Sequence, residues 1–305
     1  SYAIPRTELD AQLVETVVEA GARLHTGTHV TALERLAPDR VRLTATRNEQ
    51  PVHYEAPLVI AADGGHATFT RSLGLAPRPA EMVAVRAYYE GDLGPADQFE
   101  IHWDAAVLPA YCWIFPSGAG CANVGVGAHV RDVKAGRLNL RAELETFIAH
   151  NPHAQARLGS ARCVSRVVGH PLRADAPDVM PYADNVLVAG EAAGVVNPLS
   201  GEGIGPSMVC GELAAEHALR ALERGAFTAE ALADYGRAFH ARFDAGHRAA
   251  RLVRRLVRYP WAVNRVMHRA NRDVTYAAQI YCILCGELSM TAFFTPQMMW
   301  KTLLG

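Results

Sequence analysis

Apolar and polar residues alternate along the first part of the chain with the period of a helix and then with that of strands. Leu9, Leu13 and Val17 recur at helical spacing and Gly21 follows them, so we predict a helix over residues 7–21. The segments after it show the short runs and two-residue alternation of strands. These predicted strands cover residues 29–33, 41–45, 52–55 and 57–62. The last run is continuously apolar, which predicts a strand covered on both faces, as in a parallel sheet.

The middle of the chain has a different pattern. Four apolar segments follow one another with turn residues between them, which predicts an antiparallel sheet. They cover residues 83–89, 98–103, 110–115 and 121–127. A helix is predicted over residues 139–150, and one further strand over residues 163–169.

The third part of the chain returns to the first pattern. A buried strand is predicted over residues 185–190, then a glycine-rich turn and a helix over residues 203–224, and helices throughout from Thr228 onward. We therefore expect an α/β fold with an α+β insert. The expected domains are a partial nucleotide-binding body at 1–76 that returns at 171–226, an antiparallel insert at 77–170, and a helical region at 227–305.

Composition narrows the classes of function. Half of the 305 residues are hydrophobic (50%) and 20% are charged, so the chain can bury a sizeable core. Thirty basic residues against 31 acidic ones give a net charge of −1, which argues against a general nucleic-acid binder. Six cysteines without metal-site spacing favour a reducing, cytoplasmic setting and predict no metal site. The first residues lack a signal-peptide pattern, and no apolar run reaches the length of a membrane span.

The strongest chemical signal is the segment 190–206. A predicted buried strand ends there at Gly190 and Glu191, and a second glycine cluster at residues 201–205 opens a helix. Small residues let a ligand approach the backbone closely, and a helix start offers unpaired N–H groups and a positive dipole. We interpret this segment as a ligand site, with two tight turns around a helix start as the alternative.

Two further signals are weaker. Asp63 and Gly64 follow a predicted strand, although such a pair suits any turn. Tyr111, Trp113 and Phe115 alternate along another predicted strand and therefore share one of its faces. That face either looks into the core or forms one wall of an apolar pocket.

Taken in order, these motifs resemble the geranylgeranyl reductase family, within the wider group of flavoproteins similar to para-hydroxybenzoate hydroxylase. That family has Asp-Gly after a strand, then Tyr-x-Trp-x-Phe-Pro, then Gly-Asp-Ala-Ala-Gly followed by Asn-Pro and Gly-Glu-Gly-Ile. The matching residues here are 62–64, 111–116 and 190–204, and residues 6–10 are similar to the family's Arg-x-x-Phe-Asp helix start. The resemblance covers about residues 1–225. It implies a Rossmann-like FAD/NAD(P)-binding body with an antiparallel β substrate domain and C-terminal helices.

The resemblance also implies roles for single residues. It places Arg6 near the flavin pyrophosphate or ribityl chain, the Val30 backbone by the adenine, and Glu191 at the ribityl or pyrophosphate region. Asp63 and Gly64 would face the cofactor and the nicotinamide approach. The other implied cofactor contacts are Gly190, Ala192, Gly194, Pro198, Gly201, Gly203, Ile204 and Gly205. The implied lining of the prenyl-chain pocket is Tyr111, Trp113 and Phe115.

Three features depart from the family pattern. Glu191 stands where the family usually has Asp, and Leu108 stands where it often has Pro, which is displaced to Pro109. The family also carries a Gly-x-Gly-x-x-Gly turn at its first strand, and this sequence shows none near its start. We therefore expect a truncated chain that lacks the first βαβ unit.

The implied activity is the FAD-dependent reduction of prenyl C=C bonds, with NAD(P)H as the reductant and an isoprenoid lipid as the substrate. One alternative is a flavin monooxygenase of the same superfamily that acts on an aromatic or polyketide substrate. Another is a fragment without catalysis.

Residues 248–272 hold many arginines, no acidic residue, and interleaved leucines, valines and aromatics. Such a stretch suits either a peripheral contact with a membrane surface or a solvated helical face. Cys282 and Cys285 match Cys-x-x-Cys only by count, and their place in an apolar helix favours core packing over a redox role.

Overall fold

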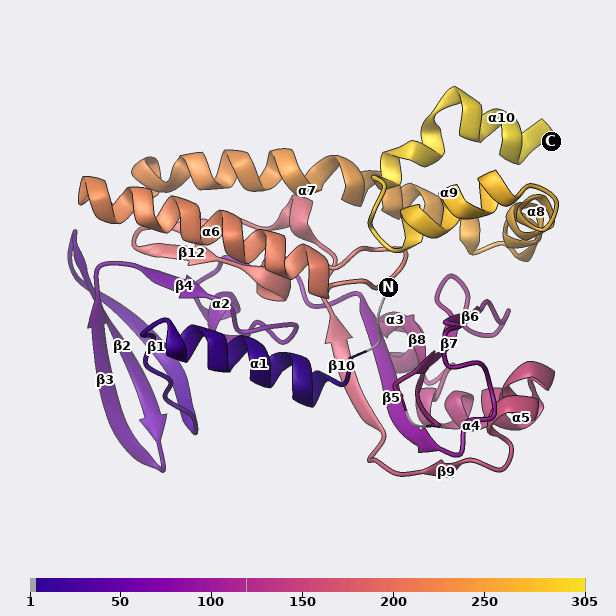
Figure 1. The fold of residues 1–305 in the computed structure, drawn as a ribbon. Helices are drawn as coiled ribbons and strands as arrows, with labels where there is room; N and C mark the ends of the chain where they lie inside the picture. Colours follow the sequence, from indigo (N-terminus) through magenta and orange to yellow (C-terminus); the bar gives the residue numbers. More distant parts are fainter. Residues whose placement is uncertain (1–3, 119, 305) are drawn as a thin grey trace. The chain divides into compact units, whose positions relative to one another are not determined.

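The computed structural model describes residues 4–118 and 120–304 and divides into two compact units (Figure 1). Unit 1 takes in the chain up to His29, residues 46–50 and residues 84–169. Unit 2 takes in residues 30–45, 51–83 and the chain from His170 onward.

An antiparallel sheet forms the framework of unit 1, apart from its residues 82–83 and 170–172, which belong to unit 2. Its strand order is β10-β5-β8-β7-β6, and β9 pairs with the end of β5. The strands are β5 (Met82–Glu90), β6 (Glu100–His102), β7 (Cys112–Pro116), β8 (Cys121–His129), β9 (Arg162–Cys163) and β10 (Val168–Leu172). The predicted antiparallel sheet is thus confirmed. The single strand predicted over residues 163–169 is wrong, because the Ser165 hydroxyl accepts the N–H of Tyr88 at 2.8 Å. This bond interrupts the backbone pairing along β5 and separates β9 from β10, which both pair with β5.

Four helices complete unit 1, namely α1 (Arg6–Glu19), α3 (Val130–Lys134), α4 (Leu140–His150) and α5 (Pro152–Leu158). Asn139 and Asn151 start α4 and α5 by accepting backbone N–H groups of the first turns. Arg157 of α5 makes a nearly buried ion pair with Asp92, at 2.6 Å, and thereby ties this helix to the loop after β5. The α1 helix was predicted from its periodicity, yet it buries none of its side chains.

A mixed three-stranded sheet with the order β11-β12-β4 lies in unit 2. Its strands are β4 (Val59–Ala61), β11 (Tyr182–Ala183) and β12 (Val186–Val188). The pairing of β12 with β4 is parallel, as the apolar runs predicted. All of β12 is buried, but Ile60 of β4 keeps 43% of its surface exposed. Coverage on both faces is therefore confirmed for β12 and wrong for β4.

Two long helices, α6 (Ile204–Arg224) and α7 (Ala229–Val257), run side by side along this sheet (Figure 1). The core between the helices and the sheet includes Leu187, Tyr235 and Phe239, each fully buried. A separate sheet of β1 (Thr28–Ala37), β2 (Arg40–Arg47) and β3 (Gln50–Ala56) packs Leu33 against the same core.

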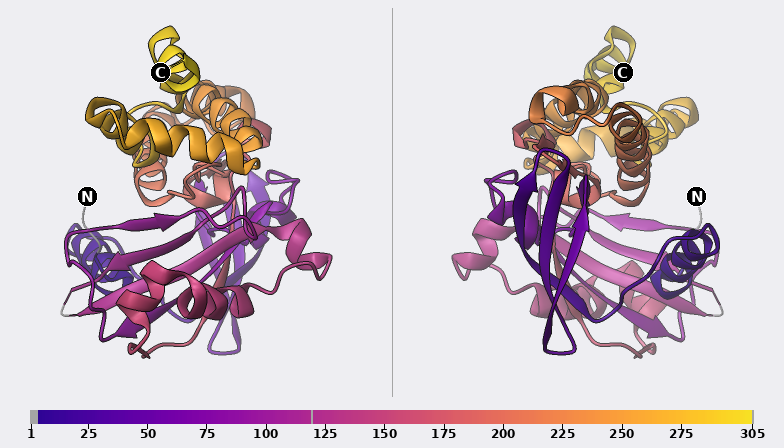
Figure 2. Two further views of the ribbon diagram at one scale, coloured as in Figure 1. Left: turned by 90° about the vertical axis from the view of Figure 1, so that its right-hand side faces the viewer. Right: turned by 90° about the vertical axis from the view of Figure 1, so that its left-hand side faces the viewer.

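The C-terminal part is helical, as predicted. Its helices are α8 (Pro260–Ala270), α9 (Val274–Leu284) and α10 (Pro296–Leu304), with a 3-10 turn η3 at Met290–Phe294. They gather beyond the end of α7 (Figures 1 and 2). Leu199, from the glycine-rich segment, packs into their core beside Tyr276 and Ile280. The C-terminal helices therefore support the segment that the sequence marks as a ligand site.

Candidate functional site

Two turns meet at the carboxyl edge of the parallel strand pair in unit 2. The registers Ile60 with Leu187 and Ala61 with Val188 bring β4 and β12 to an end side by side. Asp63 follows β4, and Gly190 and Glu191 follow β12, in the 3-10 turn η2 (Gly190–Ala193). This edge is where open α/β sheets bind their ligands. The structure thus brings together two motifs that lie more than a hundred residues apart in the sequence.

Gly65 packs tightly against β10 and against Glu191 of the second turn. A Cβ at position 65 would lie 2.4 Å from the carbonyl oxygen of Pro171 and 2.9 Å from Oε1 of Glu191. No side chain fits in that space, so this position requires glycine. The neighbouring Gly64 differs, because a Cβ there would meet nothing within 4 Å. The turn therefore packs tightly on one side and leaves a bare backbone surface on the other.

The Glu191 carboxylate joins this edge to β10 and to the residue that follows it. Its Oε2 lies 3.2 Å from Nε2 of His170, and its Oε1 accepts the backbone N–H of Arg173 at 3.4 Å. The His170 ring in turn meets the ring of His66, with centroids 5.6 Å apart. Glu191 therefore has partners within the protein, and His170 and Arg173 are neighbours that the sequence did not point to.

Asp63 stabilises the turn that it belongs to through hydrogen bonds to the backbone that follows. Its carboxylate accepts the backbone N–H groups of Phe69, at 2.8 Å, and of Thr70, at 3.2 Å, and it also accepts the Thr70 hydroxyl. These bonds fix the start of the short helix α2 (Thr68–Ser72) and hence the shape of the turn around Gly64.

The segment 190–205 is buried in its first half and accessible in its second half. Residues 192–196 and 198–200 are buried, and Asn197 Oδ1 accepts the N–H groups of Leu199 and Ser200. Gly201, Gly203, Ile204 and Gly205 lie at or near the surface. Of the cofactor contacts that the sequence implied here, Ala192, Gly194 and Pro198 are therefore internal, and the stretch from Gly201 to Gly205 is open to a ligand.

Glu202 lies just before α6, and no sequence motif alone pointed to a role for its side chain. Its Oε1 accepts the N–H of Gly205 at 2.8 Å, so one of the helix-start donors already has a partner. Burial raises the pKa of the Glu202 carboxyl, while the N–H groups of Gly205 and Ile204 oppose that rise. A carboxylate just before a predicted helix start is a signal that could have identified it, because such a side chain can accept the unpaired N–H groups of the first turn.

A buried ion pair between Arg173 and Asp175 stabilises the segment 190–205. The Arg173 side chain is fully buried, donates to Asp175 Oδ2 at 2.7 Å and donates to the carbonyl oxygen of Arg78 at 2.8 Å. Burial raises the pKa of Asp175, and the Arg173 charge opposes this. The backbones of Arg173 and Ala176 pair with those of Val196 and Gly194. The pair thus fixes the path of the glycine-rich segment.

In unit 1, Tyr111, Trp113 and Phe115 form a continuous row along β7. Neighbouring ring centroids in the row are 6.0 Å and 6.2 Å apart, and Phe99 extends it at 5.2 Å from Phe115. The alternate residues Cys112 and Ile114 are buried in the core. The row therefore occupies the less buried face of the strand, so the interpretation of a core-facing stripe is wrong. We call Phe99, Tyr111, Trp113 and Phe115 the aromatic row.

Trp113 is held in a defined place within the row. Its Nε1 donates to Oδ1 of Asn123 at 2.9 Å. Its ring lies over Gly125, the residue opposite it on β8, where a Cβ would come within 2.1 Å of the indole. Asn123 and Gly125 therefore position the indole, and the sequence alone gave no reason to name either of them.

The remaining implied contacts lie elsewhere. Arg6 belongs to unit 1, where it pairs with Asp10 at 2.8 Å on the exposed surface of α1. Val30 lies in β1 of unit 2 and is half-buried.

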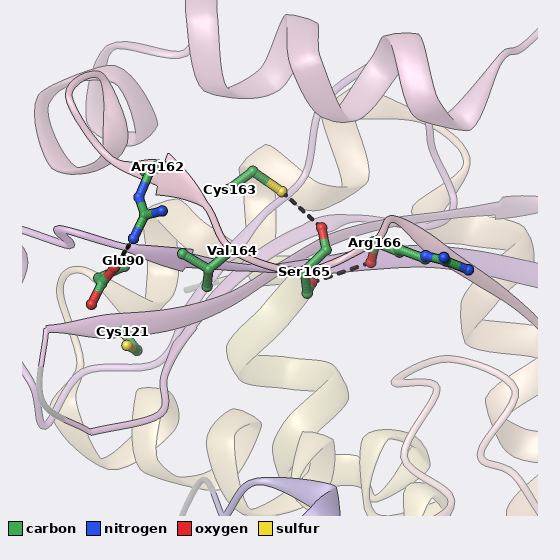
Figure 3. A pocket seen from close by; sticks show the side chains of 7 residues that line it. All are labelled: Glu90, Cys121, Arg162, Cys163, Val164, Ser165 and Arg166. Atoms are coloured by element: carbon green, nitrogen blue, oxygen red, sulfur yellow. Dashed lines mark hydrogen bonds and ion pairs between the residues drawn. The ribbon is translucent and has the colours of Figure 1, made fainter.

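A depression of about 700 Å³ also opens on unit 1, lined by Glu90, Cys121, Arg162, Cys163, Val164, Ser165 and Arg166. Arg162 reaches Glu90 at 2.6 Å, whereas Arg166 extends in the other direction (Figure 3). The two arginines that line this depression therefore do not point toward a common ligand position.

Comparisons with known proteins agree with these motifs. A family model described as FAD dependent oxidoreductase matches residues 7–217. A digeranylgeranylglycerophospholipid reductase of Methanopyrus kandleri is 33% identical over 241 residues, which make up 77% of this chain and 62% of that protein. A menaquinone reductase of Mycobacterium tuberculosis is 32% identical over 245 residues, 78% of this chain and 59% of that protein.

Among solved structures, a geranylgeranyl bacteriochlorophyll reductase-like protein of Thermoplasma acidophilum has the same fold. Its TM-score is 0.73 at 23% identity, and the match covers 83% of this chain and 63% of that one. The chain thus spans less than two thirds of the length of each of these relatives. The expected fold class and the resemblance to geranylgeranyl reductases are confirmed, and this chain belongs to the FAD dependent oxidoreductase family.

Proposed function

We propose that this chain is part of an FAD-dependent reductase that saturates C=C bonds in the prenyl chains of a lipid. The aromatic row is the observation that carries the proposal, because linked apolar rings on an accessible face suit a long hydrocarbon. The names of the relatives from Methanopyrus kandleri and Mycobacterium tuberculosis support a lipid or quinone as the substrate class.

The carboxyl edge in unit 2 is the proposed place for FAD. The bare backbone at Gly64 and the accessible stretch from Gly201 to Gly205 fit a large, flat ligand that needs close approach. Bound FAD would supply the transfer of electrons. Asp63 and Glu191 would keep the two turns in shape through their internal hydrogen bonds. The other proposed contacts at this edge are Gly190 and Ile204.

The proposed task of residues 77–170 is to bind the substrate. Trp113, fixed by Asn123, would orient the prenyl chain, and the rings of the aromatic row would exclude water around the double bond. Each reduced bond gains two electrons and two protons. NAD(P)H would provide a hydride, and the second proton would come from Tyr111 or from water. We place the protein in the cytoplasm, where this reductant is available.

Product analysis under anaerobic conditions tests this function. The chain is purified, incubated with FAD and a reductant, and given an archaeal-type geranylgeranyl ether lipid. We expect lipid products that have gained two hydrogen atoms per reduced bond, together with quenching of FAD fluorescence on binding. The Trp113→Ala variant should raise KM for the lipid while FAD binding stays unchanged.

The alternatives give different results. A product that has gained one oxygen atom, formed only when oxygen is present, would identify a monooxygenase. A chain that leaves FAD fluorescence unchanged and the lipid unreduced would overturn the proposed activity for this polypeptide.

A further inference from the structure

The structure divides the arginines of residues 248–272 into two groups. Five of them have partners within the protein: Arg248 with Asp244, Arg251 with Asp178, Arg254 with Glu81, Arg269 with Asp273, and Arg265 with the carbonyl oxygen of Thr302. The side chains of Arg255, Arg258 and Arg272 are exposed and make no hydrogen bond or ion pair with residues 4–118 and 120–304. Most of the basic stretch thus has a structural role, and a smaller set of charges is free to meet a partner.

Apolar side chains surround two of these free arginines. Leu252 and Leu256 near the end of α7 are 45% and 48% exposed, and Tyr259 in the corner before α8 is 52% exposed. Together with Arg255, these residues recur at the spacing of one helix face. Trp261 at the start of α8 is 64% exposed, and its ring stacks on that of Tyr259 with centroids 6.4 Å apart.

We call Leu252, Arg255, Leu256, Arg258, Tyr259 and Trp261 the α7–α8 corner. Tryptophan and tyrosine combine an apolar ring with a polar N–H or O–H group, a combination that suits the boundary between lipid and water. Arginine beside them attracts anionic headgroups, and the leucines add apolar area. No helix in the part of the chain that the structure describes is long and apolar enough to cross a membrane.

We propose that the α7–α8 corner docks onto the surface of an anionic lipid bilayer. Charge favours this occupant over a second copy of the chain. A symmetric dimer through the corner would bring Arg255 and Arg258 close to their own copies, and residues 248–272 offer no acidic side chain to compensate. All residues of the α7–α8 corner belong to unit 2, and their docking to lipid does not depend on the proposed reductase activity. Such docking would keep the protein at the surface from which a lipid substrate comes.

Vesicle co-sedimentation tests this proposal. The purified chain is mixed with phosphatidylcholine vesicles, and separately with vesicles in which part of the lipid is phosphatidylglycerol. We expect binding to the anionic vesicles, little binding to the neutral ones, and weaker binding as salt is raised. Removing both charges, in Arg255→Gln with Arg258→Gln, should weaken binding about 30-fold. Trp261→Ala should weaken it as well, because the apolar anchor is lost.

Two variants control for a general loss of charge or apolar surface. Arg237→Gln removes an exposed arginine from the same helix, and Leu219→Ala removes a side chain of α6 that is 61% exposed. Both should bind vesicles like the unchanged chain. The proposal is overturned if the chain ignores anionic vesicles, if corner and control variants lose binding equally, or if the corner variants change only the dimerisation measured by ultracentrifugation. None of these readouts needs FAD or turnover, so they stay separate from the test of the reductase.

Discussion

The turns of unit 2 and the aromatic row of unit 1 are built in opposite ways. At the turns, carboxylates such as Asp63 and Glu191 already bond to the protein, and Gly65 has no free space around it. In the aromatic row, rings touch rings, and Trp113 donates a hydrogen bond to Asn123 of β8. Substitutions at the turns should therefore destabilise the fold, because the site relies on internal hydrogen bonds. Substitutions in the aromatic row should change which ligand binds and leave the fold intact.

The buried pair beneath the glycine-rich segment should give the largest effect. Arg173→Met leaves the Asp175 carboxylate buried without its cation, so we expect the free energy of unfolding to fall by about 3–5 kcal/mol in urea titrations. Arg237→Met, which breaks an exposed pair with Asp234, should change it by less than about 0.5 kcal/mol. Equal losses in the two variants would contradict the importance of burial. Arg173→Met combined with Asp175→Leu should recover part of the loss.

The substitution of Gly65 should give the second largest loss of stability. Gly65→Ala places a methyl group against the Pro171 backbone, which we expect to cost about 1–3 kcal/mol of unfolding free energy. It should also weaken FAD binding, because the two turns must separate. Gly246→Ala is the matched control, since a Cβ at that helical position meets nothing within 4 Å, and it should stabilise the chain slightly. Thermal unfolding and FAD fluorescence measure both changes, and a Gly65→Ala variant that melts like the unchanged chain would argue against the close packing.

The aromatic row should give the smallest change in stability. Asn123→Ala removes the acceptor for the Trp113 N–H, which we expect to cost about 1 kcal/mol and to raise KM for a prenyl lipid several-fold. Near-ultraviolet circular dichroism should report the loosened indole. Asn264→Ala on the exposed surface of α8 is the matched control and should leave both readouts unchanged. Loss of folding in Asn123→Ala would show that the aromatic row is required for the fold and is not only a surface for ligands.

The features that depend on local pattern could be predicted from the sequence. Helix α1, the strands β5 to β8 and the glycine-rich turn after β12 follow from periodicity and from small residues. The split between β9 and β10 could not be predicted, because it depends on a hydrogen bond from Tyr88 to a hydroxyl 77 residues away. The roles of Arg173, Asn123 and Phe99 could not be predicted either, because these residues meet their partners only in the folded chain.

Glu202 limits how tightly the backbone N–H groups at the start of α6 can bind a ligand. Because its carboxylate already occupies the Gly205 amide, a ligand atom arriving there replaces an existing bond and adds no new one. The enthalpy gained at this amide would be small, and selectivity would have to come from the rest of the ligand. Mild acid, by neutralising this internal competitor, would free the amide for an incoming anion.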